Sequence, residues 1–301
     1  MKQLLEDSDF ILAEAAIVER LRRDSKIKLH DSLVHAPLIY DALASTSLKQ
    51  VYKDYISIAK ASNIPILICT PTWRANRDRV QNSTINSSVN IDAIRFMQEV
   101  RNEFHNAKHL IKIGGLIGCK NDCYLPEEGL STAEAEEFHS WQIEQLSTTS
   151  PDFLFAATLP NVDEALGIAK AMQSSELPYI ISFVIGRDGK VLDGSSLEKA
   201  IELIDTKTEV PPLGYFVNCS YPSFLNPENI GSAELKRLIG LQANASSLDH
   251  CDLDGASELH ADSLSEWGEL MLELNQQSGI KIMGGCCGTN NEHLQYMVDN
   301  R

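Results

Sequence analysis

The 301-residue sequence has no apolar run long enough to cross a membrane. Its longest purely apolar runs, such as residues 64–69, are far shorter than the roughly 20 residues that a membrane-spanning helix needs. The first ten residues carry acidic side chains where a secretory signal peptide has basic ones, and no long apolar segment follows them. These absences predict a protein of the cytoplasm.

Basic residues are scarce: 26 Lys and Arg stand against 42 Asp and Glu, which gives a formal net charge of −16 at pH 7. A charge of this sign repels phosphate backbones and anionic membrane surfaces. We therefore expect neither nucleic acid nor a membrane as a partner, and the sequence indicates no oligomeric state. The hydrophobic share of 43% and the charged share of 23% are typical of a globular protein.

No GxGxxG motif follows the early apolar segments, which disfavours an open dinucleotide-binding sheet. Instead, short runs rich in β-branched residues alternate with amphipathic stretches, at intervals of roughly 36 residues, the size of a βα unit. The predicted strands span residues 27–30, 64–70, 110–117, 153–157, 179–185, 214–218, 238–242 and 280–283. We predict an α/β fold, a (β/α)8 TIM barrel forming one domain over residues 1–301.

The segment before the first predicted strand has a helical pattern. Residues 9–23 place Phe10, Ala13 and Ile17 at helical spacing, with acidic residues early and arginines late. We therefore predict an N-terminal leading helix, within a helical extension over residues 1–25.

The cysteine content argues against a disulfide framework, because an odd number of cysteines without an export signal is typical of reduced thiols. The seven cysteines occupy positions 69, 119, 123, 219, 251, 286 and 287. We expect Cys69 to be a buried thiol and Cys251 a partly exposed one. Cys119 and Cys123 follow the third predicted strand, without a histidine to support a metal site, so we expect them to be metal-free.

Three of the cysteines stand at strand ends, where barrel enzymes carry their reactive groups. Cys219 follows the sixth predicted strand, whereas Cys286 and Cys287 follow the eighth with glycines on both sides, which lets two successive side chains turn toward one point. Three sulfur ligands favour Zn²⁺ over magnesium or calcium and leave a fourth coordination position for water or substrate. The alternative is a set of small buried side chains without a metal.

Other side chains near the predicted barrel mouth have two interpretations each. Arg74, in TPTWRAN (70–76), has a guanidinium that suits a substrate carboxylate, or it pairs with a nearby acid or water. We expect Trp73 to pack within its loop and His139 to make a structural hydrogen bond. Asn244, after the seventh predicted strand, either binds substrate or caps a turn.

The sequence resembles the homocysteine S-methyltransferase family through VNCS (217–220) and GGCCGT (284–289). Further segments follow the family's pattern at 136–146, 152–165, 179–197 and 242–247. The resemblance implies a zinc-bearing (β/α)8 barrel that transfers a methyl group to a thiol, with Cys219, Cys286 and Cys287 as the metal ligands.

Two departures from the family pattern affect the expected substrate site. LHDSLVHAPL (29–38) lies where the family has its LDGxxGTxL signature, with Asp31 kept but Ser32 and His35 in place of glycines. A proton-transfer role for His35, near the mouth, is a minor alternative. Ala157 stands where the family commonly has a glutamate before its TxP segment. The resemblance implies that Asp31 holds the substrate ammonium without the second carboxylate.

These observations predict a zinc-dependent S-methyltransferase that moves a methyl group from a sulfonium-type donor to a thiol acceptor such as homocysteine, forming methionine. S-methylmethionine, S-adenosylmethionine and betaine-like donors all remain open. The alternative is a non-catalytic zinc- or thiol-binding barrel that has lost amino-acid recognition. A Schiff-base aldolase is disfavoured, because neither LGYFVNCS (213–220) nor GGCCGT contains a lysine.

Overall fold

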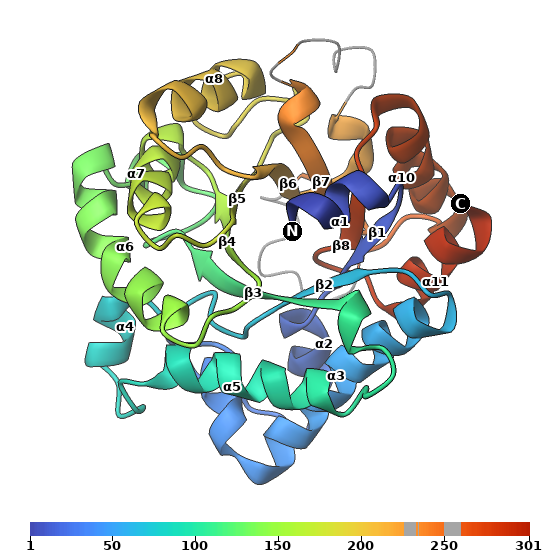
Figure 1. Cartoon of the computed structure of the whole chain (residues 1–301), viewed down its shortest axis with the longest axis horizontal. Coiled ribbons are helices and arrows are strands. Elements are labelled where there is room, and N and C mark those ends of the chain that lie inside the picture. Colours follow the sequence, from blue (N-terminus) through green and yellow to red (C-terminus); the bar gives the residue numbers. More distant parts are fainter. Residues whose placement is uncertain (226–232, 234, 250–259) are drawn as a thin grey trace.

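A computed structural model of the chain describes residues 1–225, 233, 235–249 and 260–301. Its strands form one closed barrel in which each strand pairs in parallel with the next and β8 pairs with β1 (Figure 1). The strands are β1 (Ile11–Ala13), β2 (Ile66–Cys69), β3 (Ile111–Gly118), β4 (Phe153–Leu159), β5 (Tyr179–Phe183), β6 (Gly214–Ser220), β7 (Leu238–Ala243) and β8 (Ile282–Gly285). The predicted (β/α)8 barrel is confirmed.

Helices surround the barrel and cover the outer faces of the strands (Figure 1). The α-helices of the described residues are α1 (Lys2–Asp7), α2 (Val18–Arg23), α3 (Ala42–Ala61), α4 (Arg77–Gln81), α5 (Val89–Asn102), α6 (Thr132–Ser147), α7 (Val162–Gln173), α8 (Leu197–Lys207), α10 (Leu264–Ser278) and α11 (Asn291–Asn300), of which α1 lies at one end of the barrel. Strands buried on both faces explain the nearly continuous apolar runs of the sequence. None of the described helices is both long and apolar enough to cross a membrane.

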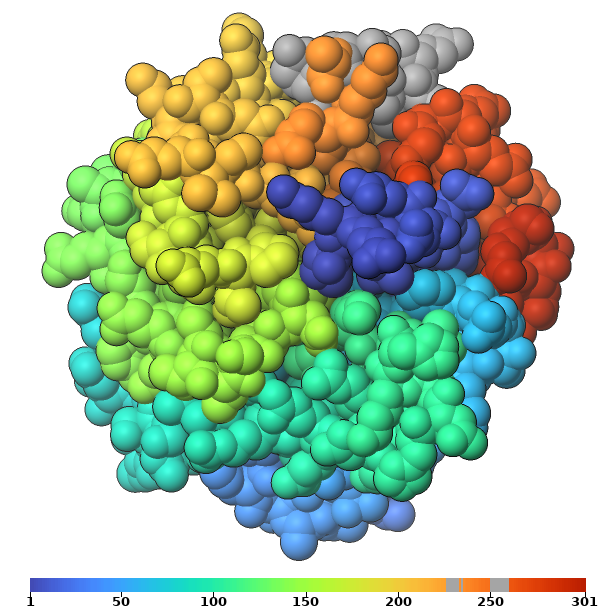
Figure 2. All heavy atoms as spheres, viewed as in Figure 1, coloured from blue at the N-terminus to red at the C-terminus, as the bar shows by residue number. Residues whose placement is uncertain are grey.

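The inside of the barrel is filled by apolar side chains from several strands. Phe155 of β4 and Phe216 of β6 meet edge to face, with ring centroids 5.1 Å apart. Leu4 and Leu5 of α1 pack against this interior cluster. Because α1 precedes β1, it covers the amino-terminal end of the barrel, where Figures 1 and 2 show it across the centre of the face in dark blue. A functional site is therefore expected at the opposite end, where the strands finish.

The predictions for the first 30 residues are partly wrong. A short helix, α1, does lead into the barrel, but the predicted helix over residues 9–23 contains β1 and becomes helical only at Val18. β1 is held by pairing on both sides, with Leu12 opposite Ile66 of β2 and Met283 of β8. This tertiary pairing overrides the local helical pattern. The extension predicted over 1–25 therefore includes a barrel strand.

The predicted strand over residues 27–30 is also wrong. His30 makes only an isolated bridge with Val34 inside a tight loop. The other predicted strands overlap β2 to β8. That the whole of 1–301 forms one domain stays a prediction.

Candidate metal centre and active site

The structure brings together the three cysteines that the sequence singled out. Cys219 lies near the end of β6, and Cys286 and Cys287 directly follow β8. Their sulfur atoms all lie within 4.8 Å of one another. The donor set and its convergence fit a thiophilic metal such as zinc, with three protein sulfurs on one side of the ion.

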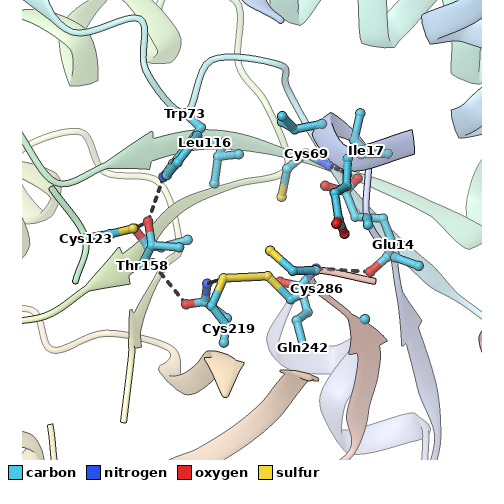
Figure 3. Close-up of a pocket in the computed structure, with 18 of the residues that line it drawn as sticks. Glu14, Ile17, Cys69, Trp73, Leu116, Cys123, Thr158, Cys219, Gln242 and Cys286 are labelled. Carbon is cyan, nitrogen blue, oxygen red and sulfur yellow. Dashed lines mark hydrogen bonds between the residues drawn. A yellow bond between two sulfur atoms is a disulfide. The ribbon is translucent and has the colours of Figure 1, made fainter. Parts of the chain in front are cut away.

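Two of these cysteines are joined: Cys219 and Cys286 form a disulfide (Figure 3), with Cα atoms 5.4 Å apart. The structure departs here from the expectation of reduced thiols, because thiols that converge on one point are also close enough to couple. Cys69, Cys119, Cys123 and Cys287 are not in disulfides. Cys251 lies outside the described residues. Metal binding by all three ligands requires the pair to be reduced, since a metal binds the thiolate form.

The backbone at Cys219 departs from a regular strand. Cys219 has a φ of 52°, in the left-handed region that side chains other than glycine seldom adopt. The pairing of β6 with β7 shifts register between Asn218 and Ser220. Such strained positions concentrate at functional sites. Here the irregularity lies at the proposed metal ligand.

The turn after β8 is held by the end of β7. The backbone N–H of Cys286 donates to the carbonyl of Ala243 (2.7 Å), and that of Cys287 donates to Oδ1 of Asn244 (3.2 Å). Asn244 is buried and does not line the cavity described below. Of its two predicted roles, the structure supports holding a turn, and that turn carries two of the three cysteines.

A cavity of about 240 Å³ opens beside the three cysteines (Figure 3). Much of its wall is apolar, including Leu116 of β3 and Phe155 of β4. Trp73 also lines it and donates from Nε1 to the hydroxyl of Thr158 (2.6 Å). The polar and charged residues along the cavity are Glu14, Glu19, Arg22, His35, Thr158, Asn218 and Gln242.

Glu14 is the acidic residue that directly follows β1, where the sequence predicts Asp31. Glu14 is 7% exposed, lines the cavity and accepts a hydrogen bond from the backbone N–H of Cys69 (2.8 Å). Burial raises its pKa to about 8. Asp31 is exposed and does not line the cavity. The missed signal was an acid placed directly after the apolar run Ile11–Ala13.

Arg74 does not reach the cavity either. Its guanidinium donates to the carbonyl of Asn121 and lies 4.2 Å from the centroid of the Trp73 ring. Through these contacts Arg74 connects the loop after β2 with the loop after β3. Arg74 is thus engaged locally, by a backbone carbonyl and not by the acid or water of the predicted alternative.

The expectation for His139 is confirmed. Nε2 of His139 lies 2.9 Å from Oε1 of buried Glu164, which is a structural contact. Cys119 and Cys123 lie outside the cluster of three sulfurs, although Cys123 lines the cavity. Ala157 lines the cavity too and is 5% exposed, so a methyl group occupies the position of the expected carboxylate.

Fold and site together define a class: a parallel (β/α)8 barrel with a cluster of cysteine sulfurs at the carboxyl ends of β6 and β8. Within that class, the chain belongs to the homocysteine S-methyltransferase family, whose family model, described as "Homocysteine S-methyltransferase", matches residues 11–300. The match begins at the first residue of β1.

Curated relatives are distant in sequence. The chain is 23% identical to Homocysteine S-methyltransferase YbgG of Bacillus subtilis, over 98% of this chain and 95% of that protein. It is 25% identical to Homocysteine S-methyltransferase 1 of Brassica oleracea var. italica, over 54% of this chain and 50% of that protein. It is 24% identical to Betaine–homocysteine S-methyltransferase 1 of Rattus norvegicus, over 56% of this chain and 44% of that protein. The chain thus spans about half the length of the last two relatives.

Solved structures share the fold. The oxidized form of the homocysteine methyltransferase MmuM from Escherichia coli superposes with a TM-score of 0.77 at 17% identity, covering 99% of this chain and 98% of that one. The metallated form gives a TM-score of 0.74 at 19% identity, covering 99% of each chain.

Proposed function

We propose that this protein is a zinc-dependent S-methyltransferase that transfers a methyl group from a sulfonium-type donor to a thiol acceptor such as homocysteine, forming methionine. The observation that carries the proposal is the convergence of Cys219, Cys286 and Cys287 at the mouth of a barrel of this family. Zn²⁺ on these thiolates would act as a Lewis acid that lowers the pKa of an acceptor thiol.

The surroundings of the cysteines support a role as ligands. Nδ2 of Asn218 donates to Sγ of Cys219, and Oδ1 of Asn244 accepts from the N–H of Cys287. Partners of this kind hold ligands in place and tune their basicity. The cytoplasm, where the proposal places the protein, keeps the Cys219–Cys286 pair reduced and able to bind metal.

The cavity wall supports a cationic methyl donor. Trp73, Tyr124 and Phe155 contribute aromatic side chains to it. Aromatic faces attract cations, and a sulfonium carries its charge next to the methyl group that is transferred. The apolar wall also limits water, so that the two substrates are aligned for in-line displacement in a poorly hydrated space. No protein nucleophile is needed.

Charged groups on the cavity suit an amino-acid acceptor. Glu14 and Glu19 are the acids, and Arg22 is a cation, among its lining residues. We propose that Glu14, in place of Asp31, receives the substrate ammonium, since it lies at the end of β1 beside the cysteines. Burial raises the pKa of Glu14 to about 8 in the free protein, and the positive charge of the bound ammonium would lower it again and favour the carboxylate. A small-molecule thiol and a small-molecule methyl donor are therefore the proposed partners.

The test is a methyl-transfer assay on reduced, zinc-loaded protein. Homocysteine and other thiols are combined with S-methylmethionine, S-adenosylmethionine and glycine betaine, and methylated thiol is measured by mass spectrometry. Cys286→Ser protein is the matched negative control. Thiol methylation by the wild type alone supports the proposal, and no product from any pair rejects it.

A second candidate is a non-catalytic zinc- or thiol-binding barrel. Ala157, a methyl group where the family commonly has a carboxylate, favours it, because one partner for an amino-acid substrate is missing. This candidate predicts stoichiometric zinc and thiol binding without methyl transfer from any of the three donors.

A further inference from the structure

His35 lines the substrate cavity and has a buried ring nitrogen without a partner. The residue directly precedes the short 3-10 helix η1 (Ala36–Tyr40), is 3% exposed and lines the cavity beside the three cysteines. Its Nδ1 is buried and makes no hydrogen bond with any described residue. A buried polar atom in this state is costly, so a native protein that retains one invites an explanation in function.

Two other polar groups along the same cavity have hydrogen-bond partners. Oε2 of Glu14 accepts from the N–H of Cys69, and the hydroxyl of Thr158 accepts from Trp73. Unpartnered buried atoms elsewhere in the described chain, such as Nδ1 of His139, do not line the cavity. His35 thus combines an unmet hydrogen-bonding requirement with a position at the substrate space.

The ring of His35 is neutral near pH 7, because burial lowers its pKa to about 4. A neutral imidazole carries its proton on one nitrogen, and Nδ1–H is a hydrogen-bond donor when the proton is there. A donor suits a carboxylate, which offers about four lone-pair sites. The cavity provides Glu14 and Glu19 for an ammonium but, among its described lining residues, only Arg22 as a cation for a carboxylate.

We propose that His35 is a substrate-binding residue whose Nδ1–H donates a hydrogen bond to the carboxylate of an amino-acid substrate in this cavity. The proposal rests on the proposed function for the class of substrate. Two substrates have such a carboxylate, the acceptor homocysteine and the donor S-methylmethionine, and the experiment tests them in separate arms.

The experiment measures binding by titration calorimetry to reduced, zinc-loaded protein. The acceptor arm compares homocysteine with 3-aminopropane-1-thiol, which keeps the thiol and the amine but has no carboxylate. The donor arm compares S-methylmethionine with (3-aminopropyl)dimethylsulfonium, which again differs by the carboxylate. In each pair the contributions of metal and ammonium cancel.

His35→Ala should weaken the binding of one carboxylate ligand by roughly 10- to 100-fold, the effect of losing a hydrogen bond to a charged group. Its affinity for the matching carboxylate-free ligand should not change. His35→Asn should bind close to the wild type, because its amide nitrogen stands at the place of Nδ1. His35→Gln, whose nitrogen stands at the place of Nε2, should bind as weakly as His35→Ala.

His293→Ala is the matched control. His293 is also a buried histidine but, unlike His35, it does not line the cavity. Zinc content and the melting temperature verify that each variant folds. If His35→Ala does not fold, the contrast between Asn and Gln at this position decides the question.

The proposal is overturned if His35→Ala binds both carboxylate ligands as tightly as the wild type. Equal losses for ligands with and without the carboxylate also overturn it, as does a wild type that binds neither carboxylate ligand. Failure of the proposed function has a different signature: wild-type protein binds both substrates but transfers no methyl group.

Discussion

The side-chain amide of Asn218 donates a hydrogen bond from Nδ2 to Sγ of Cys219, over 3.2 Å. Its orientation is set from the other side, because Oδ1 accepts from the backbone N–H of Thr158 (2.9 Å) and from the hydroxyl of Ser182 (2.5 Å). Thr158 also receives the indole N–H of Trp73. A chain of hydrogen bonds therefore links an aromatic residue of the cavity wall to a sulfur of the metal cluster (Figure 3).

Asn218→Asp should weaken zinc binding by roughly 10- to 100-fold, the usual effect of losing a partner of a metal ligand. The carboxylate has no N–H to donate to Sγ and adds a like charge beside the thiolate. Competition with a chromophoric chelator measures the affinity. Asn244→Asp is the control, because it keeps the side-chain oxygen that accepts the hydrogen bond from the N–H of Cys287. Its loss of zinc affinity should be smaller than that of Asn218→Asp. Equal losses in the two variants would contradict the role assigned to Asn218.

Cys286→Ser and Cys287→Ser should each abolish stoichiometric zinc, because a hydroxyl replaces one of three thiolate ligands. The barrel should stay folded, since these residues lie at its mouth and not in the core. Metal analysis and far-UV circular dichroism check both expectations. Cys123→Ser, which changes a cavity cysteine outside the cluster, should keep its zinc. Full zinc retention in both cluster variants would refute the metal site.

Ala157→Glu should tighten homocysteine binding by roughly ten- to a hundredfold, which corresponds to about 1.5–3 kcal/mol for a charge-assisted hydrogen bond. The change places a carboxylate on the cavity wall, where the wild type has a methyl group. Titration with homocysteine measures the affinity. Ala157→Gln introduces a side chain of the same size as glutamate but without its charge, so it separates the effect of charge from that of volume. Two results together would contradict this prediction: a micromolar Michaelis constant for homocysteine in the wild type, and no tighter binding in Ala157→Glu. They would show that the missing carboxylate does not limit homocysteine binding.

Glu14 should make the free energy of unfolding depend on pH. Burial raises its pKa from 4.5 to about 8, so the folded state keeps a proton that the unfolded state releases between these values. The stability from this proton is fully present below pH 4.5 and is lost as the pH rises through 8, by an amount on the order of a few kcal/mol.

Glu14→Gln removes this ionisation and should flatten the dependence. Melting temperatures of reduced, metal-free protein between pH 5 and 9 measure it, with the wild type as the reference for all other groups. Parallel curves for the two proteins would mean that Glu14 does not bind the proton in the folded state.

Much of this protein was determined by short-range sequence patterns. The recurrence of β-branched runs and amphipathic stretches predicted the barrel, because each βα unit carries its own periodicity. The glycine-flanked pair Cys286–Cys287 and the distant Cys219 predicted the cysteine cluster, because parallel strands of a closed barrel end at the same rim.

Tertiary structure decided what local pattern could not. Ile11–Ala13 is a strand within a helical-looking segment, since its hydrogen bonds come from β2 and from β8, some 270 residues away. That one change puts Glu14 at the cavity and leaves Asp31 outside it. The burial of His35 follows in the same way from the packing of a loop against the barrel mouth. Such contacts join residues far apart in the chain, and no short-range periodicity records them.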